Sequence, residues 1–315
     1  MRMLIHCALV VLLGFSLLPA AGVDIPGQAK FATPNDAATA LAQALKTNDL
    51  DRLKTIFGAD AVQAVSSGDP VADRNDREVV ALAMEQSWRW APHGVNRKEL
   101  VIGAEAWPFP VPLVKRATGW QFDVVAGQRE VLARRIGRNE LTVIGICRAY
   151  VAAQKEYASQ GHDGKPAGIF AQKVRSAEGH QDGLYWPAGT GVAPSPLGDL
   201  AAEAAADGYD RQKNPTAPFH GYYFRILTAQ GNFAPGGAKD YITNGNMSGG
   251  FALLAYPAKY GASGVMTFIV NQSGVVYQKN LGKDTAQLAA AITTYNPSKT
   301  WTRVRNPVPV KTAAK

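Results

Sequence analysis

Residues 128–159 read QREVLARRIGRNELTVIGICRAYVAAQKEYAS, and this stretch decides the fold. Apolar and aromatic side chains recur along it every three or four residues, which is the spacing of one helix face. The members of that face are Ile136, Val143, Cys147, Tyr150, Val151, Gln154 and Tyr157. Most of the arginines and lysines lie elsewhere around the helix. The stretch therefore predicts the longest helix of the protein, with one buried face.

Strands are predicted after this helix. Four extended segments cover residues 222–229, 251–256, 265–271 and 275–279. Side chains in the first of them alternate between two sets with a period of two, which is typical of a sheet. Asn271 to Gly274 predict a hairpin turn, and Asp284 predicts the start of a last helix over 285–295. We expect an α+β domain over residues 127–296, in which the long helix packs on an antiparallel β-meander.

Helices and then strands also precede the long helix. Thr33 and Pro34 are typical of a helix start, a short amphipathic helix covers 50–57, and Asp69 and Pro70 begin a third helix that extends to Trp88. Extended segments follow at 99–103, 109–116 and 120–125. Because prolines cannot donate to a ladder, the middle segment is either an edge strand or begins irregularly. We expect an N-terminal α+β domain over residues 31–126, with helices and a small antiparallel sheet.

The N-terminus predicts export. Arg2, an apolar run over residues 4–18 and small residues after Pro19 follow the order of a secretory signal peptide. We assign residues 1–22 to this signal, with cleavage after residue 29 as an alternative and an uncleaved anchor as the competing interpretation. Export implies a periplasmic or secreted location. No second run of 18 apolar residues occurs, so we expect no transmembrane segment in the mature chain.

The composition excludes several classes of protein. Of the 315 residues, 46% are hydrophobic and 18% are charged, which excludes a disordered chain. Two cysteines are too few for a disulfide scaffold. The formal net charge of +8 is spread along the chain, which favours plain solubility over a binding surface for anionic partners. Arg134, Arg135 and Arg138 are the candidate site for an anionic polymer, and residues 297–315 are expected to form a mobile basic tail.

Motifs of several enzyme classes are absent. The sequence has no phosphate-binding loop, no glycine-rich dinucleotide motif, no serine elbow and no His-Glu-x-x-His pair. The histidines match no spacing of metal ligands, and the residues around Asp163 offer too few carboxylates for calcium. We therefore expect neither a cofactor nor a metal.

Aromatic and polar residues concentrate around two connections near the predicted sheet, and they are our binding candidates. Aromatic rings beside charged groups can stack on sugars or hold a peptide. The candidates are Tyr185, Trp186, His220, Tyr222, Tyr223 and Arg225. The competing interpretation is that these rings anchor long loops on the sheet, since burying an aromatic ring stabilises the fold.

Catalytic candidates are weak. Asp182 and His220 are the best acid–base pair that the sequence offers, and they would serve an envelope hydrolase that acts on a glycan or a peptide. Ser67 and Asp69 lie on a turn with Asp73 and Arg74, where helix capping explains them better than nucleophilic catalysis. Cys147 lies within the apolar helix face, which predicts a buried, unreactive thiol.

Three resemblances add to these observations. The second half resembles a pilin- or pseudopilin-type globular domain, but a separate domain precedes its helix, so polymerisation is not implied. The segments that carry it are 135–140, 157–159, 221–227, 251–257 and 267–276. The first half resembles a nuclear-transport-factor-2-like cone in its helical hairpin, residues 34–57, and in its strand pair, residues 111–115 and 120–123.

The whole chain resembles an uncharacterised family of exported bacterial proteins, a domain of unknown function. The segments that carry this match are SSGDPVADR (66–74), WPFP (107–110), DGLYWP (182–187) and FHGYYFR (219–225). The resemblance brings no activity with it. Since no catalytic set converges, we expect a non-enzymatic protein for binding or envelope assembly, with an unknown envelope protein or glycan as its partner. The envelope hydrolase is the alternative.

Overall fold

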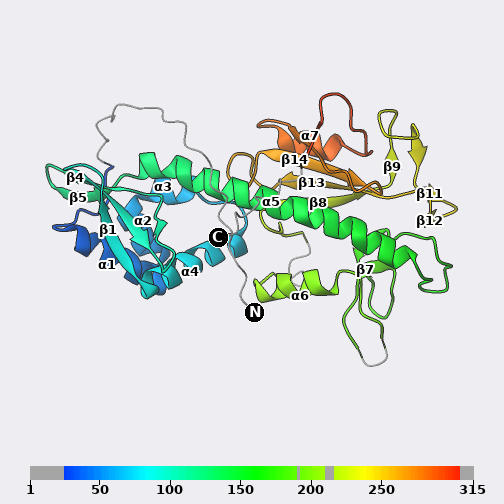
Figure 1. Cartoon of the computed structure of the whole chain (residues 1–315), viewed down its shortest axis with the longest axis horizontal. Helices are drawn as coiled ribbons and strands as arrows, with labels where there is room; N and C mark the ends of the chain where they lie inside the picture. The colour runs from blue at the N-terminus through cyan, green and yellow to red at the C-terminus, as the bar shows by residue number, and fades with distance from the viewer. Residues whose placement is uncertain (1–24, 190–191, 210–215, 306–315) are drawn as a thin grey trace, which may run out of the picture.

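The computed structural model describes residues 25–189, 192–209 and 216–305. One helix, α5 (Val124–Ala158), runs through both halves of the molecule (Figure 1). At about 1.5 Å per residue, its 35 residues span roughly 52 Å. The lobe before it has its own hydrophobic core, and so has the lobe after it. The predicted class, α+β, is confirmed, and the signal peptide assigned to residues 1–22 lies outside the described residues.

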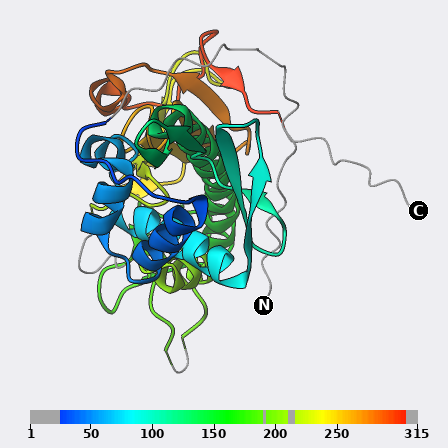
Figure 2. The same ribbon diagram turned by 90° about the vertical axis from the view of Figure 1, so that its left-hand side faces the viewer.

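The N-terminal lobe packs its helices on one side of a five-stranded antiparallel sheet (Figure 2). Its elements are α1 (Pro34–Lys46), α2 (Leu50–Phe57), α3 (Ala59–Ala64), α4 (Pro70–Gln86), β1 (Trp88–Pro92), β2 (Arg97–Ile102), β3 (Trp107–Pro108), β4 (Leu113–Arg116) and β5 (Gly119–Phe122). Thr33 and Asp36 form a capping box at α1, and such a cap satisfies backbone donors that the first turn leaves unpaired. The predicted helix start is therefore confirmed.

Two details of the N-terminal prediction differ from the structure, and one alternative that the sequence left open is decided. Trp88 begins strand β1 instead of ending a helix, because Trp88 and Trp90 pack on the core from this strand. The short helix α3 was not predicted. Strand β4 lies between β2 and β5 rather than at an edge; it begins only at Leu113, after the prolines, so the irregular start is confirmed.

The C-terminal lobe places its main sheet between α5 and α7, as Figure 1 shows. The sheet is antiparallel in the order β16-β15-β14-β13-β8, a meander with short hairpins inserted before β13. The elements after α5 are β6 (Lys173–Arg175), β7 (Gly183–Tyr185), α6 (Gly198–Ala206), β8 (Tyr222–Leu227), β9 (Ala229–Gln230), β10 (Lys239–Asp240), β11 (Ile242–Thr243), β12 (Asn246–Met247), β13 (Ala252–Pro257), β14 (Met266–Asn271), β15 (Tyr277–Asn280), α7 (Thr285–Ala291) and β16 (Thr302–Arg303).

Helix α5 holds both lobes with polar contacts as well as apolar ones. Val124 belongs to the N-terminal core, whereas the C-terminal core includes Val143, Cys147, Tyr150, Val151, Ala153 and Tyr157. Where the helix enters the second lobe, Glu140 Oε1 accepts from the backbone N–H groups of Val265 and Met266, both at 2.9 Å. The boundary predicted between residues 126 and 127 falls inside the first turn of this helix.

Of the predicted basic tail, residues 297–315, the structure describes only the part up to Arg305. Residues 297–305 do not leave the fold as a tail: Trp301 packs against the core, and β16 pairs with β15. Burial of an indole ring outweighs the polar composition there. Near the other end, the buried Gln28 amide donates to the carbonyls of Ile56 and Phe122. Gln28 is therefore part of the packed N-terminal lobe.

Two exposed glycines, Gly137 and Gly145, lie inside α5, and a Cβ added at either position meets open space. Glycine in a helix interior costs about 0.5–1 kcal/mol relative to alanine because it loses more backbone freedom on folding. We expect Gly137→Ala to raise the free energy of unfolding by that amount in urea denaturation. Gly127→Ala is the contrasting variant and should lower it, because its Cβ would lie 2.8 Å from Val111 Cα. An unchanged stability in both would contradict the assignment of α5 as a continuous helix.

No helix in the described ranges combines the length and the apolarity needed to cross a membrane.

Candidate functional site

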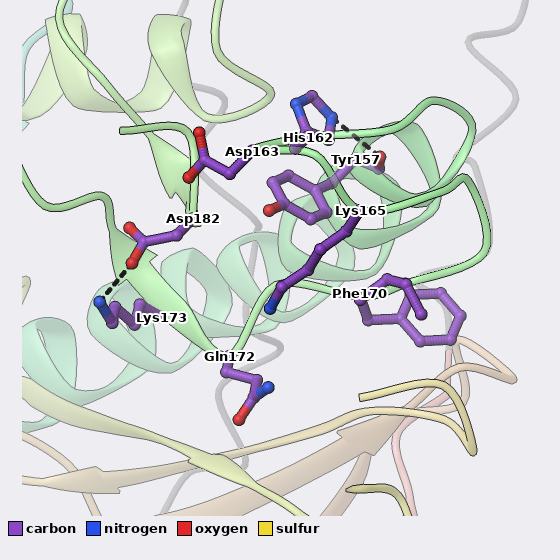
Figure 3. Close-up of a pocket in the computed structure, with 9 residues that line it drawn as sticks. Tyr157, His162, Asp163, Lys165, Phe170, Gln172, Lys173 and Asp182 are labelled. Carbon is purple, nitrogen blue, oxygen red and sulfur yellow. Dashed lines mark hydrogen bonds and ion pairs between the residues drawn. The ribbon is translucent and has the colours of Figure 1, made fainter. Parts of the chain in front are cut away.

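A hollow of about 160 Å³ lies at the C-terminal end of α5 and is the candidate site (Figure 3). Tyr157 from the last turn of α5 forms one wall, and the following loop and the residues around β6 and β7 form the others. The lining residues are Tyr157, His162, Asp163, Lys165, Ile169, Phe170, Gln172, Lys173 and Asp182. A cavity of about 150 Å³ holds a benzene-sized molecule, so the hollow suits a group of one ring or smaller.

The loop that forms the hollow is tied back to α5. The buried Gln154 amide donates to Ala171 O at 2.8 Å and accepts from Ala171 N at 2.9 Å. Asp163 has a φ of +49° and Gly164 one of +75°, so the chain reverses directly after His162. On the far side, β6 and β7 pair in parallel, and a Cβ on Gly183 would lie 2.6 Å from the Arg175 carbonyl carbon. The hydrogen bonds of Gln154, the turn after His162 and the close pairing of β6 with β7 therefore determine the shape of the hollow.

Both carboxylates of the hollow already have partners. Asp182 accepts from the Lys173 ammonium and from Ala177 N. These hydrogen bonds, that of Lys173 first, hold the pKa of Asp182 below its usual value, so it stays ionised at neutral pH. Asp163 accepts from Gln181 N through both oxygens at 3.1 Å, and it faces the His180 ring at 3.5 Å.

Aromatic rings close one end of the hollow. His162 stacks on Tyr157 with ring centroids 4.1 Å apart, and its two nitrogens contact Gln181 Oε1 and Tyr157 O. Burial raises the pKa of Tyr157 to about 12, and its hydroxyl donates to Gln181 O at 2.7 Å. Trp186 is 5% exposed and donates to Ala193 O at 2.9 Å. Trp186 and His162 also line a smaller neighbouring hollow of about 60 Å³.

The structure does not gather the predicted binding residues into one surface. Tyr185 lies beneath Arg175, whose guanidinium is 5.5 Å from the tyrosine ring centroid. Trp186 anchors its loop. On β8 the side chains point to opposite faces: Tyr222 is fully buried and donates to Met266 O. Its neighbour Tyr223 instead packs beside Tyr256.

Arg225, the last of these candidates, donates to the carbonyls of Ala289 and Ile292 at 2.5 Å each. It therefore closes the C-terminal end of α7, where the helix stops four residues earlier than predicted. Most of these side chains anchor loops or cap elements, as the competing interpretation of the sequence has it.

The predicted catalytic pair lies in two different surroundings. Asp182 belongs to the hollow, whereas His220 packs among Tyr209 and Phe219, with its Nε2 atom 3.9 Å from Asp207. Burial is the largest cause that lowers the pKa of His220, which favours its neutral form. Within the part of the chain that the structure describes, no hydrogen bond or ion pair joins Asp182 and His220.

A buried carboxylate joins the two lobes, and its partners were not predicted. Asp69 is 1% exposed, and its Oδ1 caps α4 by accepting from Val71 N and Ala72 N. Its Oδ2 accepts from the Tyr209 hydroxyl at 2.9 Å and from Gly221 N at 3.0 Å. The capping role is confirmed. The second role links segments more than 130 residues apart, which no local pattern reveals.

The three arginines proposed for an anionic polymer all have partners inside the protein. Arg134 pairs with Glu130 at 2.6 Å and stacks on Trp107. Arg138 pairs with Asp76 at 2.5 Å. Arg135 is buried and contacts Asp73 and Asp76 at 3.3 and 3.5 Å.

Metal and thiol chemistry find no support in the described residues. There, no three His, Cys, Asp or Glu side chains gather in a way that would hold a metal ion. The predicted burial of Cys147 is confirmed, and burial raises the pKa of its thiol to about 12. A thiol with so high a pKa carries almost no thiolate at neutral pH and is a poor nucleophile.

Fold and site together define a two-lobed α+β protein with a small polar hollow at the end of its central helix. Residues 28–304 match the family described as "Protein of unknown function (DUF2950)", and the chain belongs to this family. The comparisons with curated proteins and with solved structures found no match. The predicted membership of a family of unknown function is therefore confirmed.

Proposed function

We propose that this chain is an exported, non-enzymatic protein for binding or envelope assembly, and that the hollow at the end of α5 is its ligand site. The proposal depends on one observation, the arrangement of charged side chains in and around the hollow. It opens to solvent and holds charged side chains, yet the candidate acid and base lie in separate surroundings. The signal-like sequence at the N-terminus supports export.

The envelope hydrolase is less well supported. A general acid has to hold a proton near the working pH, which requires a raised carboxyl pKa. The pKa of Asp182 is shifted in the opposite direction by Lys173 and Ala177. The hollow also lacks a nucleophile that is activated by a neighbouring base, since both nitrogens of His162 contact other groups.

Two further predictions remain proposals. A long helix across an antiparallel meander agrees with a pilin-type relationship of the second lobe, and helices on one side of a sheet agree with a cone-like first lobe. Binding of an anionic polymer through Arg134, Arg135 and Arg138 gains no support from their contacts, because each guanidinium has an acidic partner.

Native mass spectrometry tests the proposed ligand site. The protein is incubated with small molecules extracted from the cell envelope, desalted and weighed intact beside Gln172→Trp, whose indole fills the hollow. The control is Gln43→Trp on the exposed side of α1. We expect an added mass on the wild type and the control, and none on Gln172→Trp. An added mass that persists on Gln172→Trp, or none on any of the three folded proteins, would refute the site. Cleavage of an extracted molecule would establish the hydrolase instead.

A further inference from the structure

We infer that the hollow selects a small organic carboxylate, and that the Lys165 ammonium is the group that selects it. This inference rests on the proposed function and names the chemistry of its ligand. Figure 3 shows the Lys165 side chain running across the hollow toward Gln172 and Lys173.

The charges of the hollow leave one cation for a ligand. Lys173 is already paired with Asp182, and Asp163 accepts two contacts from Gln181 N. Among the residues that the structure describes, Lys165 makes no ion pair; only its backbone is hydrogen-bonded, to His162 O. An ammonium in this position offers three donors to an anion.

Tyr157 and Gln172, two other polar residues of the lining, already donate hydrogen bonds within the protein. The Tyr157 hydroxyl donates to Gln181 O, and the Gln172 amide nitrogen donates to Gly245 O at 2.8 Å. The Gln172 carbonyl oxygen remains as an acceptor for a ligand hydroxyl or N–H group. Recognition of a negative group therefore depends mainly on the Lys165 charge, with minor contributions from Lys173 and from the second N–H of the Gln172 amide.

The size of the hollow and the apolar residues in its lining restrict the class of ligand. Ile169 and Phe170, both half-buried, offer apolar surface for a compact carbon body. About 160 Å³ is well below the 300–1,000 Å³ of typical sites for larger ligands. Phosphate monoesters carry a charge of about −1.5 to −2 at neutral pH, which the neighbouring Asp163 and Asp182 would repel more strongly than a single carboxylate. A monocarboxylate on a body of one ring or smaller fits best.

Titration followed by two-dimensional NMR of the full-length protein tests the inference. The probes are glucuronate, N-acetylalanine and benzoate, which separate a sugar acid, a peptide end and an aromatic acid. Glucose, N-acetylalaninamide, benzamide and inorganic phosphate are the matched negative probes. We expect at least one carboxylate to shift the resonances of residues 157–173, with an affinity that falls as salt is added. Its uncharged partner and phosphate should cause no such shift.

Variants separate the inference from the proposed function. Lys165→Gln should weaken carboxylate binding at least tenfold, Lys165→Arg should retain most of it, and Lys155→Gln, an exposed lysine of α5 outside the hollow, should leave it unchanged. Binding that survives Lys165→Gln, or equal binding of an uncharged partner, overturns the inference and leaves the ligand site standing. If no carboxylate binds while mass spectrometry finds a neutral ligand, the inference about Lys165 is refuted and the ligand site is retained. If neither method finds a ligand, the inference and the proposed ligand site are both refuted.

Discussion

Asp69→Ala should lower the free energy of unfolding by about 4 kcal/mol. The substitution removes a helix cap, worth about 1 kcal/mol. It also leaves the Tyr209 hydroxyl and Gly221 N–H without their buried acceptor, at about 1–3 kcal/mol each. Burial alone raises the pKa of Tyr209 above its usual value, so in the variant the hydroxyl keeps its proton and its desolvation is not relieved by ionising. Urea denaturation measures the loss.

Asp49→Ala is the matched control for this prediction. Asp49 caps α2 by accepting from Arg52 N at 2.9 Å, but it is exposed and makes no hydrogen bond or ion pair with the described part of the second lobe. We expect a loss of about 1 kcal/mol from this variant. Equal losses from the two variants would mean that the bonds of Asp69 to the second lobe contribute nothing to stability.

The second large effect is expected at Arg135. Its side chain is 9% exposed and holds two carboxylates of α4, Asp73 and Asp76, together with the carbonyl of Val65. Removing one partner of a buried ion pair costs about 3–5 kcal/mol because the remaining charge loses its compensation. Both aspartates keep other partners, so we expect Arg135→Ala to cost about 3 kcal/mol, near the lower limit of that range.

Two variants test the physical reason behind this value. Arg138→Ala removes a pair whose arginine is 58% exposed, and such pairs contribute about 0.2–1 kcal/mol. Arg135→Met keeps the volume while it removes the charge, and it should be as destabilising as alanine if the unpaired aspartates cause the loss. If Arg135→Met restores full stability, packing rather than charge determines the contribution of this residue.

Much of the fold could be predicted because local chemistry determines it. Thr33 predicts the start of α1, where it forms a capping box with Asp36. The spacing of apolar residues from Val143 to Tyr157 predicts the buried face of α5. The burial of Arg135 could not be predicted from local sequence patterns. Its charge predicted an exposed position, but the carboxylates that allow its burial come from α4, more than 55 residues earlier. Pairing at that distance leaves no periodic signal.

The candidate site was largely beyond prediction from the sequence. Asp182 was selected, and it does line the hollow, but its expected partner His220 lies elsewhere. Lys165 and Gln172 lie on a connection without regular spacing. The parallel pair of β6 and β7 that supports them has only three residues in each strand. Gln154, within an otherwise apolar helix face, was a further signal, since a buried amide requires partners and here holds the loop.

Helix α5 is an uninterrupted part of two hydrophobic cores. Its backbone hydrogen bonds resist bending, and its side chains are packed in both lobes, so rotating one lobe against the other requires repacking along the shaft. A ligand in the proposed site would therefore contact the end of a rigid helix that reaches into both cores. A partner that contacts both lobes would bind a surface in which the distance between the lobes is already fixed. Such preorganisation lowers the conformational entropy lost when the complex forms.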